Sequence, residues 1–231
     1  MKLFPENIST YGNEIDELFY LILILAGIAF IISLFILFYP LVKYHYKKIP
    51  RAEYITGTGW KQLKWIALPL ILLGFCDFAI LTKEHGTWVE IMKAPEQYDF
   101  HISATGRQWN WIFQYPGPDG KLYTGDDVFV DEQNSELHVP VNKTVMVDIK
   151  ARDVLHSFFL PNLRFKYDAI PGRTVVRWFN ATKTGKYEIN CAEICGVLHS
   201  KMRNYLVVDS QEDFEKYLQN LYQKKENSTI N

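Results

Sequence analysis

Two long apolar stretches dominate the first third of the chain. Residues 18–42 contain no charged side chain, and residues 65–82 contain a single one, Asp77. An α-helix needs roughly 20 predominantly apolar residues to cross the hydrocarbon core of a bilayer, with a range that begins near 17. We therefore predict two membrane-spanning helices over these residues, joined by a loop at residues 43–64. A buried helix of a soluble protein is the ordinary alternative for each stretch.

The charges that flank the stretches give an orientation. A signal peptide has a basic start and a shorter apolar part, whereas Glu14, Asp16 and Glu17 precede the first stretch, so we interpret it as a retained helix. The loop between the stretches is rich in lysine and arginine, and basic loops remain on the cytoplasmic side. The sequence thus predicts a multi-pass protein with both termini on the outer side of the membrane.

From about Tyr98 onward the pattern changes to short runs rich in β-branched and aromatic residues, separated by turn signals. The predicted strands are residues 100–103, 109–114, 136–140, 144–150, 174–180, 186–190 and 203–209. Several short strands at this spacing indicate a small antiparallel sandwich or barrel over residues 98–210. Ser210 is a suitable N-cap for a helix that we expect to run through Tyr222, so residues 211–231 form a C-terminal helix and a polar tail. Residues 1–17 are expected to form an outer segment before the first helix.

The net charge and the positions of the cysteines limit the functional classes to which the protein can belong. The formal net charge of the 231 residues is -1, which gives no basic field for binding nucleic acid. Of the three cysteines, Cys76 lies in the second apolar stretch and is interpreted as a packing residue. Cys191 and Cys195 fall in the outer domain, where a disulfide bond is the ordinary alternative.

Residues 191–202 gather soft metal ligands in one short segment. The segment contains Cys191, Cys195, His199 and Met202. Thiolate and thioether ligands favour Cu(I), and imidazole suits copper generally. One cysteine followed by histidine and methionine is typical of a mononuclear blue-copper site, but a second cysteine allows two thiolates to bridge two metal ions. We therefore predict a pair of copper ions, since a disulfide bond would leave His199 and Met202 unexplained.

His156 is the best candidate for the ligand that this segment lacks. It follows a strand-like run and precedes apolar residues that can shield a metal. A lone histidine in such a place is more often structural, but the missing ligand favours metal binding here. With His156 and His199 each capping one copper ion and Met202 as a weak axial ligand, no position remains for a substrate. We expect a closed site that moves electrons.

Four motifs resemble subunit II of the haem–copper cytochrome c oxidases. They are Gly106-Arg-Gln-Trp109-Asn-Trp111, Asp153-Val-Leu-His156-Ser-Phe-Phe, Asp168-Ala-Ile-Pro171-Gly172-Arg173, and Cys191-Ala-Glu-Ile-Cys195-Gly with His199 and Met202. The resemblance covers nearly the whole chain. It implies a two-helix transmembrane hairpin, an all-β cupredoxin-like Greek-key domain and a C-terminal helix. It also implies a binuclear CuA centre that accepts electrons from cytochrome c and passes them to haem in subunit I, where oxygen is reduced to water.

The resemblance also implies roles for individual residues. The CuA ligands would be His156, Cys191, the backbone carbonyl of Glu193, Cys195, His199 and Met202. The Glu193 side chain matches a ligand of a magnesium ion shared with subunit I, and Trp109 matches the aromatic residue at which electrons from cytochrome c enter.

The same resemblance implies partners and a location. The expected partners are subunit I, which alone carries the haems, together with subunit III, cytochrome c and the lipid bilayer. The location would be a respiratory membrane, either a bacterial plasma membrane or a mitochondrial inner membrane, with the copper domain on the outer side.

A set of acidic residues is a candidate docking face for a basic cytochrome, because opposite charge speeds encounter. The set is Asp126, Asp127, Asp131, Glu132, Glu136 and Asp153. A solvated loop is the alternative for Asp126 and Asp127.

One departure from the family pattern keeps alternatives open. Many members carry a glutamate at the start of the second span, near the mouth of a proton path, where this chain has Gln62. Because glutamine cannot titrate, a nitric oxide reductase with a CuA-bearing subunit is the alternative to an oxidase. A copper-delivery protein that uses the Cys-x3-Cys pair, usually on a thioredoxin-like fold, is a second alternative.

Overall fold

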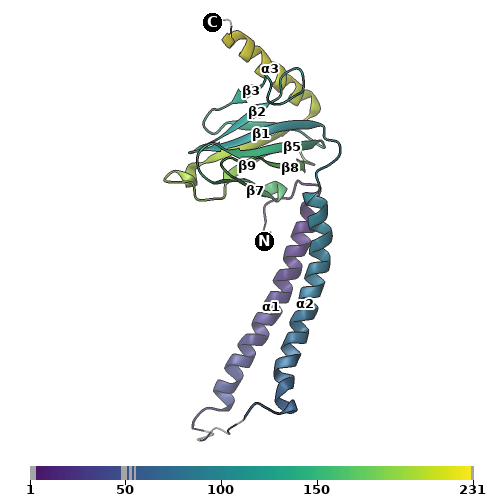
Figure 1. The fold of residues 1–231 in the computed structure, drawn as a ribbon, viewed down its shortest axis with the longest axis vertical. Coiled ribbons are helices and arrows are strands. Elements are labelled where there is room, and N and C mark those ends of the chain that lie inside the picture. Colours follow the sequence, from purple (N-terminus) through teal and green to yellow (C-terminus); the bar gives the residue numbers. More distant parts are fainter. Residues whose placement is uncertain (1–3, 48–50, 52–53, 55, 230–231) are drawn as a thin grey trace. The chain divides into compact units, whose positions relative to one another are not determined.

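The computed structural model of the chain describes residues 4–47, 51, 54 and 56–229 (Figure 1). It divides into two units, one of residues 14–91 and one that joins the residues up to Asn13 to those from Met92 onward. Parts of the predicted loop at residues 43–64 lie outside the described residues.

The first unit contains two long helices, α1 (Gly12–Lys43) and α2 (Trp60–Met92). Within the described residues, these two helices are long and apolar enough to cross a membrane. Both extend beyond the apolar stretches at 18–42 and 65–82, because hydropathy detects only the apolar part of a helix whose ends are polar. Lys83 Nζ of α2 lies 2.9 Å from Glu17 Oε2 of α1, which links the helices where the first apolar stretch begins.

The second unit is built on a sandwich of two five-stranded sheets. The first sheet has the order β3 (Val128–Val130), β2 (Asn110–Tyr115), β1 (Phe100–Arg107), β5 (Thr144–Ala151) and β8 (Val175–Asn180). The second has the order β4 (Glu136–Pro140), β10 (Arg203–Asp209), β9 (Gly185–Cys191), β6 (His156–Leu160) and β7 (Phe165–Ala169).

The predicted sandwich is confirmed, but its strands are not all antiparallel. β1 pairs with β5 in parallel, and β4 pairs with β10 in parallel. Each of these pairs is joined by a long excursion through other strands, which is the connection that parallel neighbours require. β3, β6 and β7 were not predicted. β3 has only three residues, whereas β6 and β7 have five residues each, as many as the predicted β4.

Aromatic side chains fill the space between the sheets. Trp111 and Phe113 of β2 and Phe158 of β6 are completely buried. Trp111 and Phe158 meet edge to face across the core with their ring centroids 4.8 Å apart. Phe158 pairs with Cys191 in the register of β6 and β9, so the aromatic core extends directly to the cysteine at the end of β9.

The segment before α1 belongs to the sandwich rather than to the helices. Ile8 is fully buried, and its backbone N–H donates to the carbonyl of Asn162 over 2.9 Å. The backbone N–H of Thr182 donates to the carbonyl of Ile8 over 2.7 Å, and Ser9 forms an isolated antiparallel bridge with Ala181. Both ends of the helical hairpin therefore join the same β unit.

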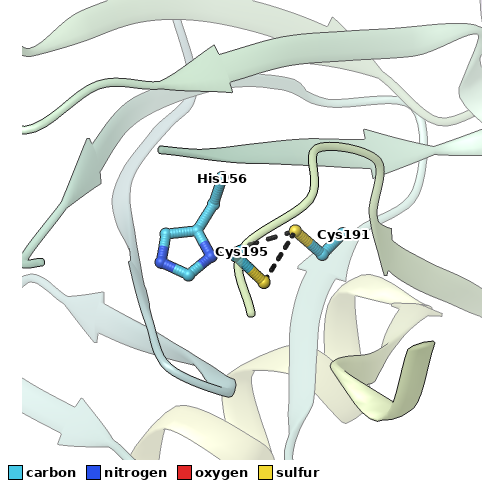
Figure 2. A group of neighbouring side chains, drawn as sticks. All are labelled: His156, Cys191 and Cys195. Carbon is cyan, nitrogen blue, oxygen red and sulfur yellow. Dashed lines mark hydrogen bonds between the residues drawn. The ribbon is translucent and has the colours of Figure 1, made fainter. Parts of the chain in front are cut away.

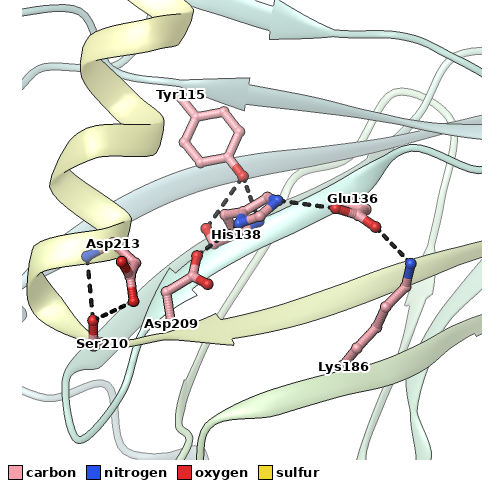
Figure 3. Close-up of polar contacts among 7 residues, drawn as sticks. All are labelled: Tyr115, Glu136, His138, Lys186, Asp209, Ser210 and Asp213. Carbon is pink, nitrogen blue, oxygen red and sulfur yellow. Dashed lines mark hydrogen bonds and ion pairs between the residues drawn. The ribbon is translucent and has the colours of Figure 1, made fainter.

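The C-terminal helix α3 (Gln211–Thr229) begins as predicted. The backbone N–H of Asp213 donates to Ser210 Oγ over 3.2 Å, which confirms the N-cap (Figure 3). Beside this cap, His138 Nδ1 lies 2.6 Å from Asp209 Oδ2. The His138 ring also stacks on Tyr217 of α3 at 3.7 Å, so the helix is fixed to β4 and β10.

The prediction that the helix ends at Tyr222 is wrong, since α3 continues to Thr229. Tyr222 Oη donates to the carbonyl of Pro116 over 3.0 Å. Lys225 Nζ donates to the carbonyls of Gly125 and Asp127 at 2.8 and 2.9 Å. These contacts with the loop between β2 and β3 stabilise a polar segment that sequence pattern alone assigns to a tail.

Candidate metal centre

The predicted ligands meet at the ends of three strands, β6, β9 and β10. Cys191 is the last residue of β9, His156 is the first residue of β6, and β6 lies beside β9. The segment that follows Cys191 connects β9 to β10, and the backbone N–H of Cys191 donates to the carbonyl of Met202 over 3.3 Å. This bond joins the two ends of the loop. The paired strands β9 and β10 flank the loop and fix the positions of its ligands.

Three side chains form the buried centre of the site (Figure 2). The Sγ atoms of Cys191 and Cys195 lie 3.8 Å apart, and His156 Nδ1 lies 3.9 Å from Cys191 Sγ. His156 is fully buried and Cys195 is 3% exposed. Both cysteines are free thiols, so the disulfide alternative does not describe this structure.

The remaining predicted ligands surround this centre. His199 Nδ1 lies 3.5 Å from Cys195 Sγ, on the other thiol from His156. Met202 Sδ lies 3.8 Å from Cys195 Sγ, and the carbonyl oxygen of Glu193 lies 3.3 Å from Cys191 Sγ. Each thiol thus has one imidazole and one weak donor beside it.

This donor set suits a pair of copper ions of the CuA type. Two thiolates, two imidazoles and a thioether are ligands that copper accepts. The sulfur atoms are 3.8 Å apart, which is less than two metal–thiolate bonds of about 2.3 Å each, so one metal ion can contact both. Because His156 and His199 lie beside different thiols, two metal ions held here would each have an imidazole of their own.

The protonation of the two thiols differs without a metal. Burial alone would raise the pKa of Cys191, but hydrogen bonds with His156 and with the backbone of Glu193 outweigh it, so that pKa is lowered. Burial and the neighbouring Cys191 thiolate raise the pKa of Cys195. A metal ion that binds both thiolates has to displace any proton that a thiol still holds, so metal binding is coupled to proton release.

Asp153 orients His156, a role that the sequence did not reveal. Its Oδ1 lies 2.8 Å from His156 Nε2, and its Oδ2 accepts the backbone N–H of Gln108 over 2.7 Å. Metal-binding histidines usually have such an outer partner on the second ring nitrogen, which fixes the tautomer. The Asp-x-x-His spacing is the signal that could have indicated it.

Trp109 lies in the turn between β1 and β2, against the metal loop. A Cβ atom built on Gly196 would lie 3.2 Å from Trp109 Nε1 and 3.0 Å from Gln108 Nε2. Gly196 has a φ of 122°, a conformation that favours glycine, and it directly follows Cys195. Gln108 Nε2 also donates to the carbonyl of Cys195 over 2.8 Å. The indole is therefore in contact with the backbone next to a ligand.

The acidic residues of the predicted docking face are largely bonded within the chain. Asp131 pairs with Arg107 at 2.7 Å, and Glu136 pairs with Lys186 at 2.6 Å. Asp127 is 3% exposed and offers no carboxylate at the surface, whereas Asp153 is exposed but bonded to His156. Glu132 remains exposed.

Met202→Leu should shift the reduction potential of bound copper while both ions stay bound. Leucine replaces methionine at nearly equal volume, so the fold should lose less than about 1.5 kcal/mol. Only the thioether is removed, which as a weak axial donor would tune the potential of bound copper. Redox titration and copper analysis measure the two effects, and Met146→Leu, a buried methionine of β5, is the control. Loss of one copper ion would contradict an axial role.

Comparisons with known proteins identify the family of the chain. The family model described as cytochrome c oxidase subunit II, periplasmic domain, matches residues 100–210. The alternative cytochrome c oxidase subunit 2 of Bradyrhizobium diazoefficiens is 28% identical over 92% of this chain and 82% of its own length. The probable cytochrome c oxidase subunit 2 of Rickettsia bellii is 30% identical over 79% of this chain and 70% of its own.

A solved structure supports the fold of the β unit. The periplasmic domain of subunit II of cytochrome oxidase from Bradyrhizobium japonicum has a TM-score of 0.51 and 35% sequence identity. The match covers 57% of this chain and 99% of that one. The predicted cupredoxin-like domain is thus confirmed. The described residues of the β unit form a sandwich of two sheets and do not have the thioredoxin-like fold usual for the copper-delivery alternative. By sequence, fold and metal-ligand set, the chain belongs to the cytochrome c oxidase subunit II family.

Proposed function

We propose that the protein is the electron-accepting subunit of a terminal cytochrome c oxidase. Its two-copper centre would take electrons from cytochrome c and pass them to haem in subunit I, where oxygen is reduced to water. The observation that carries this proposal is the pair of cysteine sulfurs 3.8 Å apart, with an imidazole nitrogen beside each. The proposed ligands are His156, Cys191, the Glu193 carbonyl, Cys195, His199 and Met202.

The residues of the site suit electron transfer without substrate binding. Copper, when bound, supplies one-electron redox chemistry. His156, Cys195 and Met202 are at most 3% exposed, so they exclude water from the centre. The ligands are fixed by strand ends and by Asp153, which limits their rearrangement when the charge of the centre changes.

Trp109 is the proposed residue at which electrons enter. Its indole contacts Gly196, the neighbour of Cys195, and it is half-buried. Close by, Ile194 and Val197 of the metal loop are 83% and 90% exposed. Exposed apolar side chains around a buried site are typical of a surface that contacts another protein. They suit docking of partner proteins close to the copper centre.

The proposed setting is a respiratory membrane, crossed within α1 and α2 at residues 18–42 and 65–82. The basic loop between the helices supports an orientation with the β unit on the outer side. Both ends of the hairpin join this unit, which agrees with that arrangement. We further propose subunit III as a partner, haems confined to subunit I, and a magnesium ion shared with subunit I through the Glu193 side chain.

Electron paramagnetic resonance of the copper-loaded protein tests the proposal. One unpaired electron shared equally by two copper nuclei gives a seven-line hyperfine pattern, whereas a single copper gives four lines. A seven-line signal is expected, and a four-line or silent signal would overturn the proposal. Oxygen and nitric oxide as acceptors are separated by the partner subunit. A His–Tyr cross-linked copper site beside its haem indicates an oxidase, and an iron site indicates a nitric oxide reductase.

Trp109→Phe should slow electron transfer from cytochrome c while the copper spectrum stays unchanged. Phenylalanine keeps an aromatic ring but lacks the indole part that reaches Gly196. Stopped-flow reduction by cytochrome c measures the rate. The matched control is Trp178→Phe, which changes a tryptophan that is hydrogen-bonded to the Lys93 carbonyl. An altered copper spectrum in Trp109→Phe would show that Trp109 is structural instead.

A further inference from the structure

Trp111 lies behind His156, on the opposite sheet of the sandwich. It belongs to β2 of the first sheet, whereas His156 begins β6 of the second. The indole and imidazole rings meet edge to face, with centroids 6.0 Å apart and planes 63° apart. Both side chains are fully buried, so this contact crosses the dry core beside the metal ligands.

Gly106 of β1 also lies against the His156 ring, and together with Trp111 it forms what we call the Gly106–Trp111 wall. A Cβ atom built on Gly106 would lie 2.9 Å from His156 Cδ2 and 3.0 Å from His156 Cγ. It would also lie 3.1 Å from Trp111 Cζ3. The backbone of β1 therefore lies against the imidazole, at a distance that leaves no room for a side chain.

These contacts restrict rotation about the second side-chain torsion of His156, which sets the plane of the imidazole ring. The second side-chain torsion of histidine has a broad preference, so packing rather than torsional energy sets the plane of the ring. Asp153 holds Nε2 of the ring, and the Gly106–Trp111 wall limits rotation about that contact. The imidazole plane in turn sets how Nδ1 faces the metal.

We propose that Trp111 is a positioning residue for the copper pair. Together with Gly106 it fixes the imidazole plane of His156, and through that plane it sets the reduction potential and the sharing of the unpaired electron between the copper ions. The proposal rests on the proposed function, because it requires copper bound at His156. It assigns to Trp111 a role beyond core packing.

Phe113 is a matched control for this role. It lies two residues further along β2, is also fully buried, and contacts Phe158 with ring centroids 6.4 Å apart. Truncating either aromatic side chain to leucine leaves a cavity in the same core, so both variants should lose folding stability. Only the Trp111 variant should also alter the copper centre.

The experiment compares Trp111→Leu, Phe113→Leu, Gly106→Ala and Trp111→Phe in the full chain. Chemical denaturation of the copper-free proteins should raise the unfolding equilibrium constant roughly tenfold or more in both leucine variants. Redox titration and electron paramagnetic resonance of the copper-loaded proteins should show a shifted potential and altered hyperfine splitting in Trp111→Leu and Gly106→Ala. Phe113→Leu should match the wild type, and Trp111→Phe should lie close to it because an aromatic edge remains.

Distinct outcomes overturn the inference and the proposed function. If Trp111→Leu binds copper with the potential and splitting of the wild type, the positioning role is wrong while the copper centre stands. If Phe113→Leu shifts the potential as much as Trp111→Leu, the effect is general core loosening. If Trp111→Leu does not fold, an unchanged potential in Gly106→Ala overturns the inference. A wild type without a seven-line signal overturns the proposed function instead.

Discussion

Replacing Cys195 by serine (Cys195→Ser) should leave the protein without a two-copper centre. Cys195 Sγ is the atom that links the site, since it lies 3.8 Å from Cys191 Sγ, 3.5 Å from His199 Nδ1 and 3.8 Å from Met202 Sδ. A serine hydroxyl is a hard donor that copper accepts poorly. Electron acceptance should fall by more than the roughly 10- to 100-fold that loss of an outer-shell partner costs.

Copper analysis and electron paramagnetic resonance measure this result. The copper content should drop to one ion or none, and the seven-line signal should disappear. Cys76→Ser is the matched control, because Cys76 lies in α2 and is not part of the site. Retention of two copper ions and of the seven-line signal in Cys195→Ser would exclude a bridging role for Cys195.

Asp153→Ala should weaken copper binding by roughly 10- to 100-fold, the usual cost of losing an outer-shell partner of a metal-binding histidine. The change leaves His156 Nε2 and the backbone N–H of Gln108 without their carboxylate partner. A buried donor without an acceptor costs free energy, so the tautomer and the ring position of His156 lose their support. Competition with a copper chelator measures the affinity.

Glu132→Ala is the control that distinguishes the support of His156 by Asp153 from docking of cytochrome c. Both residues belong to the acidic set that the sequence assigned to a cytochrome-binding face, but Glu132 is exposed and Asp153 is bonded to His156. Glu132→Ala should change only the salt-dependent rate of reduction by cytochrome c, because loss of an exposed charge acts mainly on encounter. If Asp153→Ala shows the same pattern with unchanged copper affinity, Asp153 is a docking residue and not a positioning residue.

The clustering of the candidate metal ligands was predictable from the sequence because most of them are close together in the chain. Cys191, Cys195, His199 and Met202 lie on one hairpin connection, so their spacing alone brings them together. His156 required one long-range step, the pairing of β6 beside β9, and the chemistry of the missing ligand was sufficient to select it.

The residues that contact His156 and Cys195 from the other sheet were not predictable from the sequence. Gly106 and Trp111 reach His156 only when the two sheets pack, and Gln108 reaches Cys195 across the same interface. A glycine in a strand or an aromatic residue in a core has many ordinary explanations, so sequence pattern cannot distinguish these positions. The parallel pairings of β1 with β5 and of β4 with β10 likewise depend on contacts between distant segments.

The bonded segment before α1 constrains how the protein is made. Ile8 and Ser9 are synthesised before the hairpin, whereas their partners Asn162, Ala181 and Thr182 follow it. These contacts therefore cannot form until the earlier segment and the later domain have reached the same compartment. A truncated protein that starts after α2 would leave the buried place of Ile8 empty and these backbone groups unpaired. For a water-soluble version, the earlier segment should be kept and linked directly to the domain.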